Sequence, residues 1–273
     1  MPRPGLPKLI ATDLDGTLVR SDDTVSAYTH EVLDRVRAAG IPVVGATGRG
    51  PRLTELTRND IRAADFLVMA GGGRVVDQSD PTGPVVLRDE RLPGPALAEL
   101  LYALEAEVGP LTVMVEALDG PNAPLWGDFD PNWPYPDRFE ARERTECVNT
   151  DVIKAFARTP DHDVDALLDI ARRVVPPEMA SITQAGLGFI EISPPGVDKA
   201  TGLAVVAQSL GVDPAEVLVF GDMPNDLPMF EWAGWGRVAV ANAHPTVRRA
   251  ADEITLRNDD DGVAIYLDRL LSR

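Results

Sequence analysis

Apolar runs alternate with amphipathic stretches near both ends of the chain. Runs at residues 8–12, 41–46 and 66–70 are separated by stretches with apolar residues at helical spacing, the first ending at Gly40. The alternation returns after residue 196, with apolar runs at 217–220, 238–241 and 254–255 and helical patterns at 200–210 and 263–271. Strands that alternate with helices are typical of crossover units, so we predict one α/β domain with a parallel sheet.

The middle of the chain has a different pattern. Helical periodicity covers residues 96–107 and 164–174, and strand-like runs cover 111–115, 152–157 and 189–192. Asp119 to Asp137 is dense in proline, glycine and aromatic residues, which indicates a structured loop. We therefore predict a core made of residues 1–81 and 194–273, with residues 82–193 inserted as a mixed α/β cap.

The composition excludes several classes of protein. The formal net charge is −17 and no basic run offsets it, so binding to nucleic acid or to an anionic membrane surface is not expected. No apolar stretch is long enough to span a membrane, and the single Cys147 excludes an internal disulfide framework. We expect a cytoplasmic protein. With this charge, a phosphorylated ligand would need a local cation.

Polar clusters follow the predicted strands, where open parallel sheets bind ligands. Asp13 and Asp15 come directly after the first strand, and residues two apart in extended backbone point to the same side. Two carboxylates that close repel each other, and a divalent cation relieves the repulsion. After the second strand, the Thr47 hydroxyl and the Gly48 N–H suit a phosphate oxygen.

Two further clusters lie in the second half of the chain. Lys199 opens a predicted helix, and its ammonium could neutralise a phosphoryl group. Gly221 to Asp226 follows a strand and supplies carboxylates and an amide, the oxygen ligands that Mg²⁺ prefers. All four clusters in this order favour a catalytic site over solvated loops.

The sequence resembles the haloacid dehalogenase superfamily, and within it the Cof-type, sugar-phosphatase-like branch with a C2-type cap. The matching stretches are Asp13–Leu18, Ala46–Arg49, Gly196–Lys199 and Gly221–Asp226. The resemblance implies a Rossmann-like core under an inserted cap. It also implies an enzyme that hydrolyses small phosphate monoesters through an aspartyl-phosphate, with a small phosphorylated metabolite as its partner.

The resemblance also implies a role for each matching residue. Asp13 would be the nucleophile, and Asp15 would protonate the leaving oxygen and later accept a proton from water. Mg²⁺ would be held by Asp13, the Asp15 carbonyl and Asp222, with Asp226 supporting it. The phosphoryl oxygens would be held by Leu14, Thr47, Gly48, Lys199 and Asn225.

Some positions favour other interpretations. Gly71–Gly73 stands where the family usually has Asn-Gly-Ala, which predicts a freer connection to the cap. Arg49 is expected to brace the core through ion pairs. Trp126, Trp133 and Tyr135 could stack on a substrate ring, although aromatic residues more often fill a small core.

Two other functions stay open at this point. A phosphotransferase or mutase would use the same aspartyl-phosphate but pass the group to an acceptor other than water. A phosphate-sensing module also combines acidic residues, threonine and lysine at strand ends, but such modules lack a cap-sized insert. The sequence does not determine the natural substrate or the oligomeric state.

Overall fold

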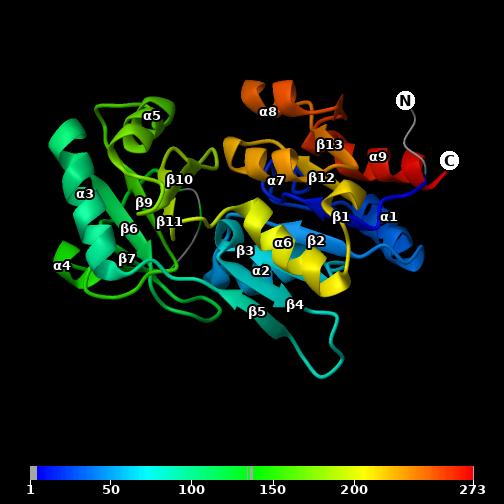
Figure 1. Cartoon of the computed structure of the whole chain (residues 1–273), viewed down its shortest axis with the longest axis horizontal. Coiled ribbons are helices and arrows are strands. Elements are labelled where there is room, and N and C mark those ends of the chain that lie inside the picture. Colours follow the sequence, from blue (N-terminus) through cyan, green and yellow to red (C-terminus); the bar gives the residue numbers. More distant parts are fainter. Residues whose placement is uncertain (1–4, 134, 136–137, 273) are drawn as a thin grey trace.

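The computed structural model describes residues 5–133, 135 and 138–272. It has two lobes (Figure 1). One lobe contains segments from both ends of the chain, and the other contains the middle segment. In the view of Figure 1 the described segments nearest the two ends of the chain lie in the first lobe, away from the second. We call the first lobe the core and the second the cap.

The core is built on an eight-stranded sheet of order β14-β13-β12-β1-β2-β3-β4-β5. Its strands from β14 to β3 run parallel, whereas β4 and β5 are antiparallel additions. The strands are β1 (Leu9–Thr12), β2 (Val43–Ala46), β3 (Phe66–Met69), β4 (Arg74–Asp77), β5 (Val85–Asp89), β12 (Val217–Gly221), β13 (Gly236–Ala239) and β14 (Glu253–Ile254).

Helices cover this sheet. All four residues of β1 are buried, and successive side chains of a strand point to opposite faces, so both faces of the sheet are covered. The core helices are α1 (Ala27–Ala38), α2 (Thr54–Asp60), α6 (Lys199–Leu210), α7 (Leu227–Trp232), α8 (Pro245–Ala250) and α9 (Gly262–Leu271). The predicted α/β fold with a parallel sheet is confirmed.

The hairpin of β4 and β5 extends the core sheet beyond its parallel part. β5 pairs with β4 in register Asp77↔Val85 to Arg74↔Asp89, although residues 85–89 fall inside the range 82–193 predicted for the cap. The hydrogen bonds of a sheet join its strands into one body, so this strand belongs with the core. We therefore propose that the cap begins near residue 90.

The cap has its own six-stranded sheet of order β10-β11-β9-β6-β7-β8, mostly antiparallel. Its elements are α3 (Gly94–Val108), β6 (Thr112–Glu116), β7 (Leu125–Gly127), β8 (Phe139–Ala141), α4 (Arg144–Cys147), β9 (Lys154–Arg158), α5 (Val164–Val174), β10 (Ser181–Gln184) and β11 (Ile190–Ser193). The predicted loop Asp119 to Asp137 contains strand β7, and its residues 134, 136 and 137 lie outside the described residues. Among the described residues, no helix has the length and apolar character needed to cross a membrane.

Candidate active site

The parallel strands bring distant polar residues to one edge of the core sheet. β1 pairs with β12 on one side and with β2 on the other, so their carboxyl ends are neighbours. Asp13 follows β1, Thr47 follows β2 and Asp222 follows β12. Of the predicted site residues, Asp13, Asp15, Gly48, Asp222 and Asn225 line one pocket at this edge.

Lys199 links two carboxylates at the bottom of the site. Its Nζ lies 2.5 Å from Asp13 Oδ1 and 2.6 Å from Asp226 Oδ1, and all three side chains are buried. Lys199 is the first residue of α6 and Asp198 caps this helix, so the start of α6 positions the Lys199 ammonium beside the two carboxylates. The predicted convergence of the first, third and fourth clusters is therefore observed.

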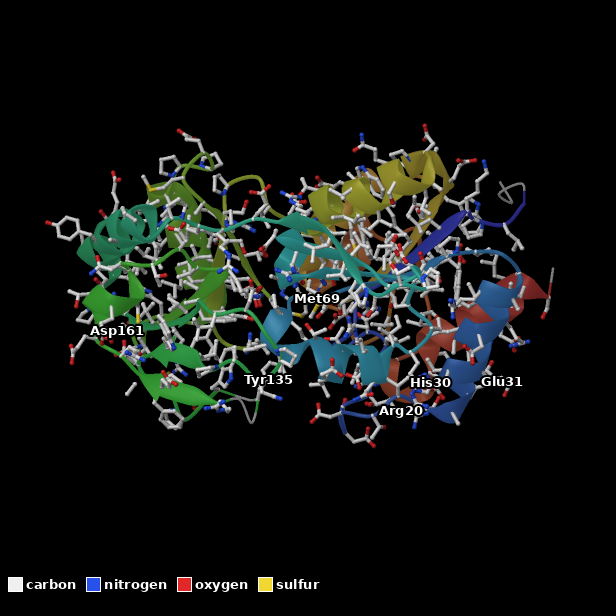
Figure 2. The ribbon with its side chains drawn as sticks, turned by 90° about the horizontal axis from the view of Figure 1, so that it is seen from below. Arg20, His30, Glu31, Met69, Tyr135 and Asp161 are labelled. Atoms are coloured by element: carbon white, nitrogen blue, oxygen red, sulfur yellow. The ribbon has the colours of Figure 1, made fainter. Side chains whose placement is uncertain are left out.

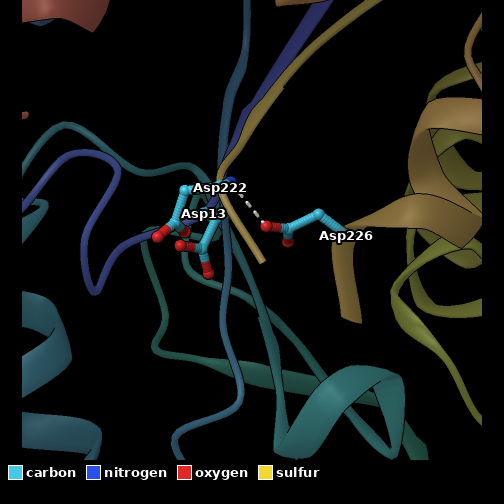
Figure 3. A group of neighbouring side chains, drawn as sticks. All are labelled: Asp13, Asp222 and Asp226. Atoms are coloured by element: carbon cyan, nitrogen blue, oxygen red, sulfur yellow. Dashed lines mark hydrogen bonds between the residues drawn. The ribbon is translucent and has the colours of Figure 1, made fainter. Parts of the chain in front are cut away.

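Three carboxylates gather above this lysine. Asp13, Asp222 and Asp226 each offer an oxygen, and these oxygens lie within 4.8 Å of one another (Figure 3). Thr17 Oγ1 donates a hydrogen bond of 2.9 Å to Asp222 Oδ1. Asp226 Oδ2 accepts hydrogen bonds from the backbone N–H groups of Asp222 and Met223, while its Oδ1 faces Lys199. Both Asp226 oxygens thus already have donors, which fits a supporting role better than direct ligation of a metal.

Burial and mutual repulsion shift the pKa values in this cluster. Burial raises the pKa of Asp13 to about 6, with Asp226 adding to the shift and Lys199 opposing it. Burial and the neighbouring carboxylates of Asp13 and Asp226 hold the pKa of Asp222 well above its ordinary range. Burial alone would lower the pKa of Lys199, but Asp13 and Asp226 keep it above its usual value. One ammonium therefore faces three buried carboxylates, and a metal ion fits this donor set.

The Asp15 carboxylate also lines the pocket, in an ion pair with Arg49. Arg49 Nη2 and Nε lie 2.5 Å and 2.9 Å from its oxygens, and Arg49 Nη1 lies 2.5 Å from Asp60. Burial opposes the charge of Arg49, but its hydrogen bond to Asp15 raises the pKa of the guanidinium. The expected bracing role of Arg49 is confirmed by these two ion pairs. The Asp15 side chain is about one-third exposed, so a ligand in the pocket can reach it.

The other residues predicted to hold phosphate differ in how they reach the pocket. The Leu14 side chain is fully buried in the hydrophobic core, so only its backbone N–H could serve. Thr47 is buried and does not line the pocket, and its hydroxyl accepts a hydrogen bond from the Arg49 N–H. Asn225 lines the pocket, and its buried Oδ1 accepts no hydrogen bond from the described residues. The roles of these residues stay predictions.

The cap closes the opposite side of the pocket with aromatic and apolar side chains. Trp133, Tyr135 and Phe156 line it, and Figure 2 shows Tyr135 where the cap meets the core. Trp126 does not line it and instead stacks against Arg142, with 5.0 Å from the guanidinium carbon to the ring centre. Burial and then the charge of Asp15 raise the pKa of the Tyr135 hydroxyl.

Two buried ion pairs, one within the cap and one between cap and core, lie at the junction of the two lobes, and the sequence pattern did not reveal either. Lys154 Nζ lies 2.9 Å from Glu191 Oε1 within the cap and donates a 2.7 Å hydrogen bond to the Gly48 carbonyl of the core. Glu116 of the cap pairs with Arg52 of the core. A charged residue inside an otherwise apolar strand pattern is the feature that could have revealed them, because such charges are rarely buried without a partner.

The glycine loop after β3 is held by contact with the start of α6. Gly72 has a φ of +112°, and a Cβ on it would overlap the Asp198 carbonyl group. Gly71 has a φ of +65° and open space where its Cβ would be. Gly72 therefore permits the close approach between this loop and the start of α6, where Lys199 lies. This role is separate from any freedom that the three glycines give to the connection with the cap.

Comparison with known proteins agrees with this geometry. Residues 10–267 match the family of haloacid dehalogenase-like hydrolases. The chain is 29% identical over 286 residues to the 5-amino-6-(5-phospho-D-ribitylamino)uracil phosphatase YwtE of Bacillus subtilis (97% of this chain, 98% of the relative). It is 30% identical to a phosphoglycolate phosphatase of Natronomonas pharaonis (95% and 96%). The crystal structure of a haloacid dehalogenase-like hydrolase from Bacteroides thetaiotaomicron superposes with a TM-score of 0.75 at 27% identity, covering 97% of this chain and 99% of that one.

These matches confirm the predicted resemblance to Cof-type hydrolases and the predicted enzyme class, a phosphoric monoester hydrolase. The match extends over nearly the whole chain, and therefore over the cap as well as the core. The chain belongs to the haloacid dehalogenase-like hydrolases.

Proposed function

We propose that the protein is a magnesium-dependent phosphatase that hydrolyses small phosphate monoesters through an aspartyl-phosphate on Asp13. The single observation that carries this proposal is the buried Asp13 carboxylate, held by Lys199 beside two further aspartates at the floor of a pocket. A carboxylate nucleophile held by an ammonium, beside further carboxylates that could hold a divalent cation, is an arrangement that suits covalent phosphoryl transfer.

The residues divide the reaction into two displacements. In the first, an Asp13 oxygen forms a bond to phosphorus as the bond from phosphorus to the leaving oxygen breaks, and Asp15 donates a proton to that oxygen. In the second, Asp15 accepts a proton from water, the water oxygen bonds to phosphorus, and the bond to Asp13 breaks. Mg²⁺ would be held by Asp13 and Asp222, with Asp226 in support. It would neutralise charge on the phosphoryl oxygens.

The pocket and the relatives together favour a small metabolite as the substrate. The cavity that remains between cap and core is small, about 30 Å³, so the cap would have to move to admit a substrate. The cap covers it and excludes a bulky phosphoprotein. Curated relatives are named for a phosphorylated uracil derivative and for phosphoglycolate. The cytoplasmic location stays a prediction.

The test is hydrolysis of p-nitrophenyl phosphate by the purified protein, with Mg²⁺ and after treatment with EDTA. We expect activity that EDTA removes and added Mg²⁺ restores. Asp13→Asn should reduce turnover to background while the circular dichroism spectrum stays native, and phosphate release should exceed transfer to added alcohols. Normal turnover by Asp13→Asn would refute the nucleophile, and predominant transfer would favour a phosphotransferase.

A further inference from the structure

The part of the pocket contributed by the cap is rich in aromatic rings. Trp133 packs edge to face against Tyr135 and Phe156, with ring centres 5.7 Å and 4.8 Å apart. The other apolar lining side chains are Leu53, Ala185, Leu187 and Met223. A leaving group that occupies this space contacts ring carbon and sulfur over much of its surface. Such walls favour a flat apolar ring over a polyol, whose hydroxyl groups would lose water without enough partners.

The cations of the pocket already have carboxylate partners. Among the described residues, Arg49 and Arg52 are the cationic side chains that line it. Arg49 pairs with Asp15 and Asp60, and Arg52 pairs with Glu116. A second anionic group on the substrate would thus have to break one of these pairs. It would also meet the carboxylates of Asp15 and Glu191, so the pocket disfavours a substrate with a negative charge beyond its phosphate.

Polar acceptors remain available beside the aromatic wall. Glu191 lines the pocket next to Gly48, since a Cβ on Gly48 would lie 3.5 Å from both Glu191 carboxylate oxygens. Lys154 balances its charge from within the cap. Asn225 lines the same pocket, and its buried Oδ1 has no donor among the described residues. These oxygens suit hydroxyl or N–H donors on a leaving group.

We infer that the substrate is the phosphate ester of an uncharged alcohol carrying a flat ring, which packs against Trp133, Tyr135 and Phe156. This inference rests on the proposed phosphatase function and deepens it. It separates ring-bearing esters from esters of hydroxy acids and of open-chain polyols, all of which are small phosphorylated metabolites.

The first test compares matched alkyl phosphates with the wild-type protein. Benzyl phosphate and cyclohexylmethyl phosphate differ in ring flatness, whereas 2-hydroxyethyl phosphate and 2-phosphoglycolate differ in one carboxylate. We expect kcat/KM to be about threefold to tenfold higher for benzyl phosphate than for cyclohexylmethyl phosphate. We also expect kcat/KM to be at least about tenfold higher for 2-hydroxyethyl phosphate than for 2-phosphoglycolate. Equal or reversed values in either pair would overturn the inference.

The second test changes the wall and uses another cap tryptophan as a matched control. Trp133→Leu should lower kcat/KM for benzyl phosphate about threefold to tenfold more than it lowers kcat/KM for 2-hydroxyethyl phosphate. Trp126→Leu removes an indole from the same lobe, outside the pocket, and should affect neither substrate. If Trp133→Leu fails to fold, Tyr135→Leu tests the same wall. Equal losses on both substrates would show a structural role and refute the assignment.

The two tests also separate this inference from the proposed function. If no ester is hydrolysed, the phosphatase proposal itself fails. If 2-phosphoglycolate or a polyol phosphate is hydrolysed best, the phosphatase proposal stands and the ring-bearing substrate class is wrong.

Discussion

Replacing Lys154 with methionine tests whether the buried charges at the junction of cap and core stabilise the closed site. The Lys154 side chain is completely buried, and it contacts the Glu191 carboxylate, the Gly48 carbonyl and the face of Phe156. Methionine has a similar length and no charge, so the substitution leaves Glu191 buried without its cation and the Gly48 carbonyl without this donor.

The size of the effect follows from the geometry of the pair. Unit charges 2.9 Å apart attract by about 6 kcal/mol at an effective dielectric constant of about 20. Desolvation offsets part of this attraction in the native pair, but the variant keeps the cost for Glu191 without the attraction. Removal of one partner of a buried pair typically costs about 3 to 5 kcal/mol, so we expect Lys154→Met to lose stability in that range.

Urea unfolding followed by tryptophan fluorescence measures the loss. The double variant Lys154→Met/Glu191→Gln should recover more than half of it, because both charges are then gone. Lys8→Met serves as a matched control, since Lys8 forms a 2.6 Å ion pair with Glu216 at the surface and its removal should leave the unfolding midpoint unchanged. A stability loss below about 1 kcal/mol for Lys154→Met, or no recovery in the double variant, would refute this account of the junction.

Two further perturbations test the site. Gly72→Ala should lower the free energy of unfolding by at least about 2 kcal/mol, because Gly72 has a φ of +112° and the new Cβ would meet the Asp198 carbonyl. Gly71 has open space at this position, so Gly71→Ala should lower it by only about 1 kcal/mol. Thermal unfolding measures both changes. Stability of the metal-free protein should fall as pH rises from about 4 to about 6, since the folded pKa of Asp13, about 6, exceeds its unfolded value of 3.8 and the folded state holds the proton longer. Mg²⁺ should then raise the melting temperature more at pH 7.5 than at pH 5, and an equal increase at both would contradict this reading of the aspartate cluster.

The parallel part of the core could be predicted closely from the sequence. The predicted strand at 217–220 and helix at 263–271 correspond to β12 at Val217–Gly221 and α9 at Gly262–Leu271. A strand buried on both faces is a continuous apolar run, which sequence patterns show directly. The hairpin of β4 and β5 was not predicted, because Val85, Val86 and Leu87 are exposed on an edge strand and give no pattern of burial.

The junction of cap and core could not be predicted for a different reason. Lys154 and Glu191 are far apart along the chain and meet only because β9 and β11 are neighbours in the cap sheet. The sequence of β9 or of β11 does not show which strand lies beside it in the sheet. The residues after β1, β2 and β12 could be placed together because parallel connections put their carboxyl ends at one edge. Pairings within the antiparallel cap have no comparable rule.

The acidic composition of the protein makes positive charge at the site necessary for binding a phosphate ester. With a net charge of −17, the protein as a whole repels a phosphate ester. Lys199 and Arg49 lie at the edge of the sheet with carboxylate partners, and the three buried aspartates beside Lys199 still exceed its single positive charge. We therefore expect an anionic phosphoryl group to approach Asp13 only when a further cation balances the cluster, so that bound metal would be a condition for substrate binding as well as for turnover. On this view, Mg²⁺ removal should weaken binding of the substrate, in addition to slowing its hydrolysis.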